Sequence, residues 1–172
     1  MPDRETGEIA WYNPDPRAIL PLDGFHRSQS LLRRIRRGGY EVTFDTRFGE
    51  VMRACADRTE TWITPEFVEA YTGLHRLGHA HSIEIVEEGR LAGGAYGVTL
   101  GGAFFAESMF HQSTDASKVA LHHLVERLND KGFQILEVQF LTPHLATLGA
   151  VAIPAEDYFR RLEIALRIPV KF

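Results

Sequence analysis

The spacing of apolar residues predicts strands in the middle and later parts of the chain. Apolar and polar positions alternate over 40–46 and 81–87, a pattern typical of half-buried strands. Segments 91–100 and 102–109 predict two more strands that meet at a glycine pair, so 81–109 reads as an antiparallel meander. The almost continuous apolar run 133–141 predicts a central strand.

Helical periodicity fills the segments between these strands. Thr64 and Pro65 are a helix cap and a first helical residue, and Gly78 ends the same helix. Helices are predicted over 28–37, 48–57, 65–77, 113–131 and 154–166, and a short strand over 17–22. The second half then runs as three strands, a helix, a strand and a helix. This α+β order, a mixed sheet with packed helices, is that of N-acetyltransferase-type folds.

Length and composition indicate a globular protein of one domain, or of one domain and a small lobe. The chain has 172 residues, of which 44% are hydrophobic and 24% charged, values that exclude a mostly disordered chain. The longest uncharged run, 91–106, is too short and too glycine-rich to span a membrane. Cys55 is the only cysteine, which excludes an internal disulfide and a cysteine-based zinc site. With no signal-peptide pattern at the start, we expect a cytoplasmic protein.

Basic residues are concentrated in one short stretch. Although the formal net charge is −4, no acidic residue lies between Asp23 and Glu41. The five basic residues in this window are Arg27, Arg33, Arg34, Arg36 and Arg37. Guanidinium groups bind phosphate oxygens in a bidentate manner, so the stretch suits a nucleic-acid backbone. A solvated helix face is an equally good explanation from composition alone.

Three polar residues interrupt apolar strands. Glu137 and Gln139 are two apart and therefore point to the same face of the predicted central strand. Glu107 lies in an apolar strand of its own, and it approaches Glu137 if the two strands are neighbours. Burying a carboxylate is costly, which indicates either a proton-transfer role or a structural ion pair.

Other chemistry-bearing residues favour structural roles. His75, His79 and His81 lie at a helix-to-strand corner, where a hydrogen-bonded histidine is a better interpretation than a metal site. The pair His122 and His123 is expected to be partly exposed, because neighbouring helical side chains diverge by about 100°. Cys55 is interpreted as a packing residue. The glycines over 93–102 match no phosphate-binding motif and favour close backbone approach.

Several strings resemble one protein family, the bacterial leucyl/phenylalanyl-tRNA–protein transferases, over most of the chain. The most specific are His79-Ala80-His81-Ser82-Ile83-Glu84 and Glu107-Ser108-Met109-Phe110. The others, in chain order, are Trp11 to Arg17, Thr61-Trp62-Ile63, Gly93 to Val98, Asp115 to Lys118, Gln139-Phe140 and Leu148-Gly149-Ala150.

The resemblance implies an acetyltransferase-like enzyme that uses aminoacyl-tRNA instead of acetyl-CoA. Such an enzyme moves Leu or Phe, and less readily Met, to the α-amino group of a protein with N-terminal Arg or Lys, which marks that protein for degradation by the N-degron route. The ester is already activated, so the resemblance implies no cofactor and no metal. We also expect no membrane partner and a monomer.

The resemblance also implies roles for individual residues. Glu137 and Gln139 match the catalytic carboxylate and its partner, and Glu107 matches the acid that binds the acceptor's basic residue. Most relatives carry Asp where this chain has Glu137, which leaves open whether its carboxylate takes the proton or orients Gln139 and the amine. Trp62 matches an aromatic at the terminal adenosine, and the arginine stretch matches the basic surface for the acceptor stem. The apolar pocket for the aminoacyl side chain matches Ala95, Phe104, Met109, Leu121, Leu124 and Leu136.

The front of the chain departs from the family pattern. Relatives begin with an additional segment, so we expect a small, truncated N-terminal lobe over 1–60 with the basic helix, followed by a catalytic domain over 61–172. A naturally short form, a late start codon and an incomplete sequence all stay open, and tRNA affinity is expected to fall. Two other functions stay open: a tRNA-binding paralogue with weak or no catalysis, and an acetyl-CoA-dependent N-acetyltransferase. An acetyl-CoA-dependent enzyme needs a glycine-containing pyrophosphate loop before the central helix, and residues 111–116 of this chain contain no glycine.

Overall fold

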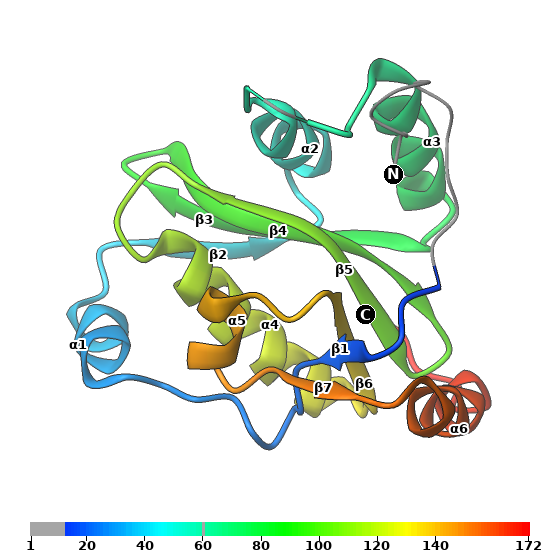
Figure 1. Cartoon of the computed structure of the whole chain (residues 1–172). Coiled ribbons are helices and arrows are strands. Elements are labelled where there is room, and N and C mark those ends of the chain that lie inside the picture. Colours follow the sequence, from blue (N-terminus) through cyan, green and yellow to red (C-terminus); the bar gives the residue numbers. More distant parts are fainter. Residues whose placement is uncertain (1–12, 60) are drawn as a thin grey trace.

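One seven-stranded sheet organises the protein, in the order β2-β3-β4-β5-β6-β1-β7 (Figure 1). The computed structural model describes residues 13–59 and 61–172. The strands are β1 (Arg17–Ile19), β2 (Glu41–Phe44), β3 (Ala80–Glu87), β4 (Arg90–Leu100), β5 (Ala103–His111), β6 (Ile135–Gln139) and β7 (Val151–Ile153). The helices are α1 (Gln29–Arg37), α2 (Phe48–Ala56), α3 (Pro65–Arg76), α4 (Ala116–Lys131), α5 (Pro143–Thr147) and α6 (Ala155–Leu166).

Helices cover both faces of this sheet. α4 lies along one face with α1 and α5 beside it, and α2 and α3 lie over the other face (Figure 1). The main apolar core forms between α4 and the sheet and includes Leu121, Leu128 and Leu136. A second core lies under α2 and α3, and a third joins Tyr158 of α6 to β1, β5 and β6. Close packing of α4 on β4 depends on Gly93, since a Cβ there would lie 2.6 Å from the Cβ of Ala116.

Pairing changes character at the centre of the sheet. β5 and β6 are parallel, whereas the other neighbouring strands are antiparallel. Their register ends at Phe105 opposite Glu137, although β5 continues to His111 and β6 to Gln139. The two strands therefore part at the positions where the sequence has its unusual polar residues.

The predicted elements are confirmed, with four corrections. α5 and β7 were not predicted, because the segment between 141 and 154 has no clear periodicity. β6 ends at Gln139, and the apolar residues after it are exposed. α4 begins at Ala116 with no side-chain cap, since the Asp115 carboxylate accepts from Lys118 Nζ at 2.8 Å instead. His122 was predicted to be partly exposed but is buried, stacked on Phe25 with ring centroids 6.1 Å apart.

The N-terminal part is not separate from the sheet. β1 and β2 lie before residue 60, yet they are the sixth and the first strands of the sheet order. A division into a lobe over 1–60 and a catalytic domain over 61–172 stays a prediction. Trp11 and Tyr12 of the first matching string lie outside the described residues. Within 13–59 and 61–172, no helix is long and apolar enough to cross a membrane.

Candidate active site

Glu107 is the extra residue of a β-bulge in β5. Ser108 pairs with Tyr96 of β4 and Ala106 pairs with Gly97, so Glu107 has no partner opposite it. A bulge bends the strand locally and redirects a side chain, which is why bulges recur beside functional sites. Here it turns the Glu107 carboxylate toward β6 at the place where β5 and β6 part.

Gln139 meets this carboxylate from the end of β6. Its φ of 62° lies in the left-handed region, which is uncommon for a residue with a side chain. The next amide, of Phe140, donates to the Val138 carbonyl at 2.8 Å and closes a tight turn. In this conformation Gln139 Nε2 donates to Glu107 Oε2 at 2.9 Å. The strained turn thus orients the amide of Gln139.

Glu137 is buried between β1 and α6. Only 3% of the residue is exposed. Arg17 of β1 donates through Nη2 to Glu137 Oε1, and the Tyr158 hydroxyl of α6 donates to Oε2 at 2.6 Å. The Arg17 guanidinium also lies over the Tyr158 ring, 4.5 Å from its centroid. Both oxygens of the carboxylate are therefore bound by protein groups.

Glu107 is in a different electrostatic setting. Burial raises the pKa of Glu107 above its usual range, and the charge of Glu137 adds to this rise, whereas hydrogen bonds from Tyr71 and Gln139 oppose it. Burial, with the neighbouring Glu107, also raises the pKa of Tyr71, which therefore stays a neutral hydrogen-bond donor. Among the described residues, no lysine or arginine forms an ion pair with Glu107.

The six residues of the predicted apolar pocket lie together on the α4 side of the sheet. Five of them are buried in the main core: Ala95, Phe104, Leu121, Leu124 and Leu136. Met109 is the partly exposed member, and it lines a cleft of about 830 Å³ over the end of β5 and the start of α4. Ala95 and Met109 are directly opposite each other in the β4–β5 ladder, so a larger side chain at 95 would lie beside Met109.

A second hollow of about 780 Å³ continues from this cleft. The two share the loop Gln112–Asp115, which precedes α4. On the far side of the loop, the second hollow is lined by Arg33, Arg34, Arg37 and Arg90. The loop Gln112–Asp115 thus lies between the hollow lined by the α1 arginines and the cleft lined by Met109.

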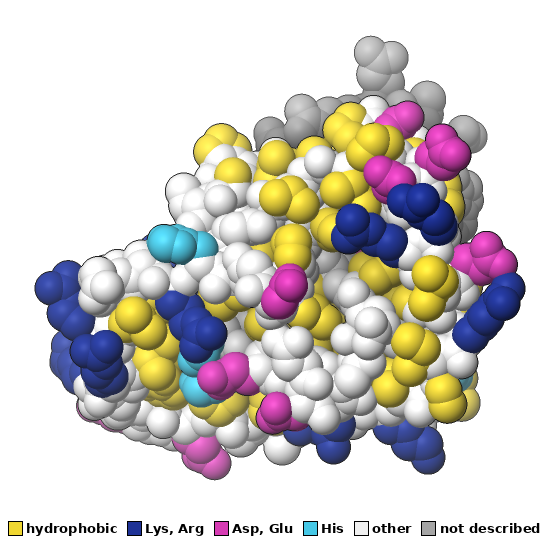
Figure 2. Space-filling view, turned by 90° about the horizontal axis from the view of Figure 1, so that it is seen from below, with side chains coloured by type: hydrophobic (Ala, Val, Ile, Leu, Met, Phe, Trp, Pro, Cys, Tyr) yellow, Lys and Arg dark blue, Asp and Glu magenta, His cyan; other side chains and the backbone are white. Residues whose placement is uncertain are grey.

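The arginine stretch contains two kinds of residue. Arg27, Arg33, Arg36 and Arg37 are exposed, and Figure 2 shows basic side chains gathered at the end of the molecule where α1 lies. Arg34 is partly buried: it pairs with Glu87, donates to the Gly38 carbonyl at 2.6 Å and lies over the Tyr40 ring. Its charge is already compensated, so Arg34 differs from its neighbours as a candidate phosphate ligand.

Trp62 lies outside these hollows, in the loop between α2 and α3. Its ring packs edge-on against Phe67 with centroids 5.5 Å apart, and the residue is partly buried. Its role at the terminal adenosine stays a prediction.

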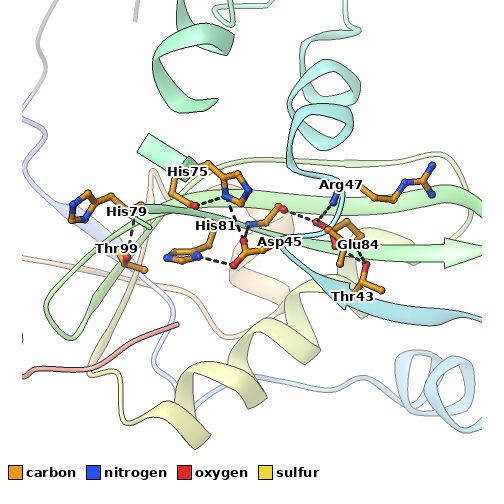
Figure 3. A network of polar contacts seen from close by, with 11 residues as sticks. Thr43, Asp45, Arg47, His75, His79, His81, Glu84 and Thr99 are labelled. Carbon is orange, nitrogen blue, oxygen red and sulfur yellow. Dashed lines mark hydrogen bonds and ion pairs between the residues drawn. The ribbon is translucent and has the colours of Figure 1, made fainter. Parts of the chain in front are cut away.

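The histidines at the α3–β3 corner, His75 and His81, belong to a separate polar network around Asp45 and Glu84 (Figure 3). His81 Nδ1 donates to Asp45 at 2.8 Å, and His75 Nδ1 donates to the Ala80 carbonyl at 2.8 Å. Glu84 is completely buried and accepts from Thr43 at 2.5 Å and from Thr46 at 3.0 Å, as well as from Ser82. The interpretation of His75 as a hydrogen-bonded corner histidine is confirmed.

Two other groups of chemistry-bearing side chains have structural explanations. Cys55 is buried, and burial raises the pKa of its thiol to about 11, consistent with packing. Among the described residues, the group whose ligand atoms lie within 4.8 Å of one another is His122, His123 and Glu126 on α4. Hydrogen bonding between His123 and Glu126 at 3.0 Å accounts for that proximity.

Sequence reasoning brought Glu107, Glu137 and Gln139 together but missed three of their partners. Arg17 could have been found from the sequence, since it is a charged residue at the start of a predicted strand and follows a proline-rich string. Tyr71 and Tyr158 gave none, because an aromatic on an amphipathic helix reads as core.

Comparisons with known proteins agree on one family. The sequence profile of the leucyl/phenylalanyl-tRNA protein transferases matches residues 19–163. A leucyl/phenylalanyl-tRNA–protein transferase of Ruegeria pomeroyi is 56% identical over 163 residues, covering 95% of this chain and 78% of that protein. One of Herpetosiphon aurantiacus is 55% identical over 173 residues, covering 100% of this chain and 91% of that protein.

Solved structures with low sequence identity share the fold. L-PGS from Bacillus licheniformis has a TM-score of 0.50 at 15% identity and covers 77% of this chain and 50% of its own. An aminoglycoside acetyltransferase from a soil metagenome has a TM-score of 0.48 at 12% identity, covering 75% of this chain and 88% of its own. The mixed sheet with packed helices and the likeness to L-PGS confirm the predicted α+β fold. By its sequence profile and its relatives, the chain belongs to the leucyl/phenylalanyl-tRNA protein transferase family.

Proposed function

We propose that this protein transfers Leu or Phe, and less readily Met, from aminoacyl-tRNA to the N-terminal Arg or Lys of a protein. The product carries a new N-terminal residue that marks it for degradation. Family membership supports the transferase activity. One observation supports the position of the active site: Gln139 donates a hydrogen bond to Glu107 beside the buried Glu137, where β5 and β6 part.

The reaction needs a neutral amine and a stabilised leaving oxygen. The acceptor nitrogen attacks the ester carbonyl carbon, a C–N bond forms, and the bond from that carbon to the ribose oxygen breaks. The nitrogen loses a proton and the ribose oxygen gains one, so the transfer needs no external oxidant or energy source. Gln139 can orient the amine through its amide, and Glu137 supplies a fixed negative charge beside it.

Glu107 suits the acceptor's cationic side chain. Glu107 is partly buried, and a desolvated carboxylate without a basic partner among the described residues gains most from a guanidinium or ammonium group that arrives with the substrate. The hydrogen bond from Gln139 then links recognition of the side chain to orientation of the α-amine. We propose that this pairing restricts acceptors to N-terminal Arg and Lys.

The aminoacyl side chain would enter the α4 face beside Met109. Ala95 and Met109, which pair across β4 and β5, suit a site that accepts several apolar side chains, because methionine adapts its shape. Phe104, Leu121, Leu124 and Leu136 would form the floor. The buried packing of these residues means that the pocket must open by side-chain rearrangement when the substrate binds.

The tRNA would approach along α1. Its single-stranded 3′ end would pass from the hollow lined by Arg33 and Arg37, over the loop Gln112–Asp115, to the cleft lined by Met109. Trp62 is proposed to contact the terminal adenosine, and base stacking on an aromatic contributes about 1–3 kcal/mol. Arg27 and Arg36 would contact backbone phosphates without reading sequence. We propose a cytoplasmic monomer that needs no cofactor.

The test is transfer of labelled Leu from Leu-tRNA to a protein with N-terminal Arg. A matched acceptor with N-terminal Ala controls for acceptor specificity, and acetyl-CoA replaces the tRNA in a parallel reaction. We expect label only on the Arg protein with Leu-tRNA. Binding of Leu-tRNA without transfer would favour the inactive paralogue, and acetylation would favour the N-acetyltransferase.

A further inference from the structure

Three side chains from distant parts of the sequence form a closed group at Glu137. Arg17 comes from β1, Glu137 from β6 and Tyr158 from α6. The guanidinium binds one carboxylate oxygen, the hydroxyl binds the other at 2.6 Å, and the hydroxyl oxygen also lies 3.4 Å from Arg17 Nη2. The side chain of Glu137 is 4% exposed and that of Arg17 is 16% exposed. Each member therefore contacts the other two.

This geometry limits what Glu137 can do. The Glu137 carboxylate already accepts from a guanidinium and a hydroxyl, so both of its oxygens are occupied and its orientation is set by two donors. Taking a proton from the acceptor would break or weaken both contacts. The nearby Glu107 carboxylate accepts a hydrogen bond from Gln139 and takes no part in the contact between Arg17 and Glu137.

We propose that Arg17 and Tyr158 are positioning residues that hold Glu137 as a fixed anion, so that Glu137 acts by its charge and not as the proton acceptor. This inference rests on the proposed function, because it assumes that Glu137 serves the transfer. It gives Arg17 and Tyr158, which lie outside β5 and β6, a positioning role in the transfer. It also predicts that neither residue has an effect on catalysis except through Glu137.

A double-mutant cycle tests this dependence. Tyr158→Phe removes one hydroxyl but keeps the ring beneath Arg17, and Arg17→Met removes the charge. In single-turnover transfer we expect rates to fall about tenfold for Tyr158→Phe and about 100-fold for Arg17→Met, with the KM for Leu-tRNA within about twofold. In the Glu137→Gln background, each further change should lower the rate less than about twofold. Arg160→Met, on the exposed part of α6, is the matched control and should behave as the parent.

Each result decides between separate ideas. Equal effects of Tyr158→Phe in the parent and in Glu137→Gln would overturn the positioning role. So would parental rates for Tyr158→Phe and Arg17→Met when Glu137→Gln is impaired. Parental turnover of Glu137→Gln would remove Glu137 from catalysis and this inference with it, and absence of transfer by the parent would overturn the proposed function. If Arg17→Met fails to fold because Glu137 is left unpaired, the Tyr158→Phe cycle alone decides the question.

Discussion

Glu84 and Glu137 are both buried strand carboxylates of one sheet, with very different surroundings. Glu84 accepts from Thr43, Thr46 and Ser82, which lie on or next to the same strand pair. Glu137 instead takes partners from β1 and α6, 120 and 21 residues away. The first carboxylate ties two adjacent strands together, whereas the second joins separate parts of the chain beside a gap in the pairing. Burial alone therefore does not distinguish the two carboxylates, whereas the origin of their partners does.

The strongest way to break this comparison is to neutralise each carboxylate in turn. Glu137→Gln should lower turnover about 100-fold, because a fixed charge at the site is lost, with aminoacyl-tRNA binding within a few-fold. Glu84→Gln should leave turnover per folded molecule unchanged and lower stability by about 1–3 kcal/mol, because an amide nitrogen replaces one of the two oxygens and cannot accept the hydrogen bonds made to it. Transfer rates and thermal melts separate the two. Comparable losses of turnover would mean that both networks serve catalysis.

Glu107→Gln sharpens the distinction within the site. It keeps the shape of the side chain but removes the charge expected to bind the acceptor's basic residue. We expect the KM for an acceptor with N-terminal Arg to rise about tenfold, since a charge-assisted hydrogen bond is lost. The KM for Leu-tRNA is the internal control and should not change. An acceptor KM equal to that of the parent would remove Glu107 from acceptor recognition.

Replacing Ala95 by Met tests the apolar side of the site. The added volume faces Met109, so Phe transfer should fall more than Leu transfer, with the Phe:Leu ratio dropping about tenfold. Competition between the two charged tRNAs in one reaction measures this ratio directly. Equal loss of both substrates would indicate that the side chain binds elsewhere.

The arginines of α1 allow a matched pair of variants. Neutralising Arg33, Arg36 and Arg37 should weaken binding of all tRNAs alike. The slope of log binding constant against log salt concentration should become shallower by about 0.7–0.9 for each lost phosphate contact. Neutralising Arg34 alone should leave that slope unchanged and lower stability, because its guanidinium already pairs with Glu87. The same slope for parent and triple variant would make this segment an ordinary solvated helix face.

The smallest expected effect is on the pH dependence of stability, where Asp45 and Glu107 should have opposite signs. Burial tends to raise the pKa of Asp45, but hydrogen bonds from His81 and the Ser82 amide lower it below the usual range. The stability that Asp45 contributes is therefore present above its unfolded-state pKa and lost as pH falls through the folded value. Glu107 has a raised pKa, so its contribution is largest in acid and is lost as pH rises through the folded value.

Melting curves from about pH 3 to 8 for Asp45→Asn and Glu107→Gln measure both contributions. Asp45→Asn should lose stability relative to the parent at neutral pH, and Glu107→Gln should gain. Parallel curves for parent and Glu107→Gln would show that the acid is not strained by burial in the folded state.

Periodicity and a few strong signals were enough to predict most of the fold. The cap at Thr64 is a local property, and it holds in the structure. The alternation over 81–87 correctly predicted a strand, but not a half-buried one: β3 is buried from Ala80 to Val86, because apolar cores lie on both faces of the sheet. α5 and β7 were not predicted. β7 forms by pairing with β1, whose residues lie about 135 positions away, and no local sequence pattern contains such a contact. The candidate acids were visible as polar interruptions. The bulge at Glu107 and the left-handed turn at Gln139, which bring the two side chains together, were not.

The position of β1 also has a consequence for how the protein folds. This three-residue strand, near the start of the chain, lies between β6 and β7, which are among the last parts to be synthesised. While the chain is still on the ribosome, β1 has no neighbour to pair with, so the guanidinium of Arg17 remains hydrated until β6 emerges. Such long-range pairing forms late and slows folding. The pairings within the meander β3–β4–β5 are local, so the meander can form first, and assembly of the Arg17–Glu137–Tyr158 group then coincides with the last step of folding.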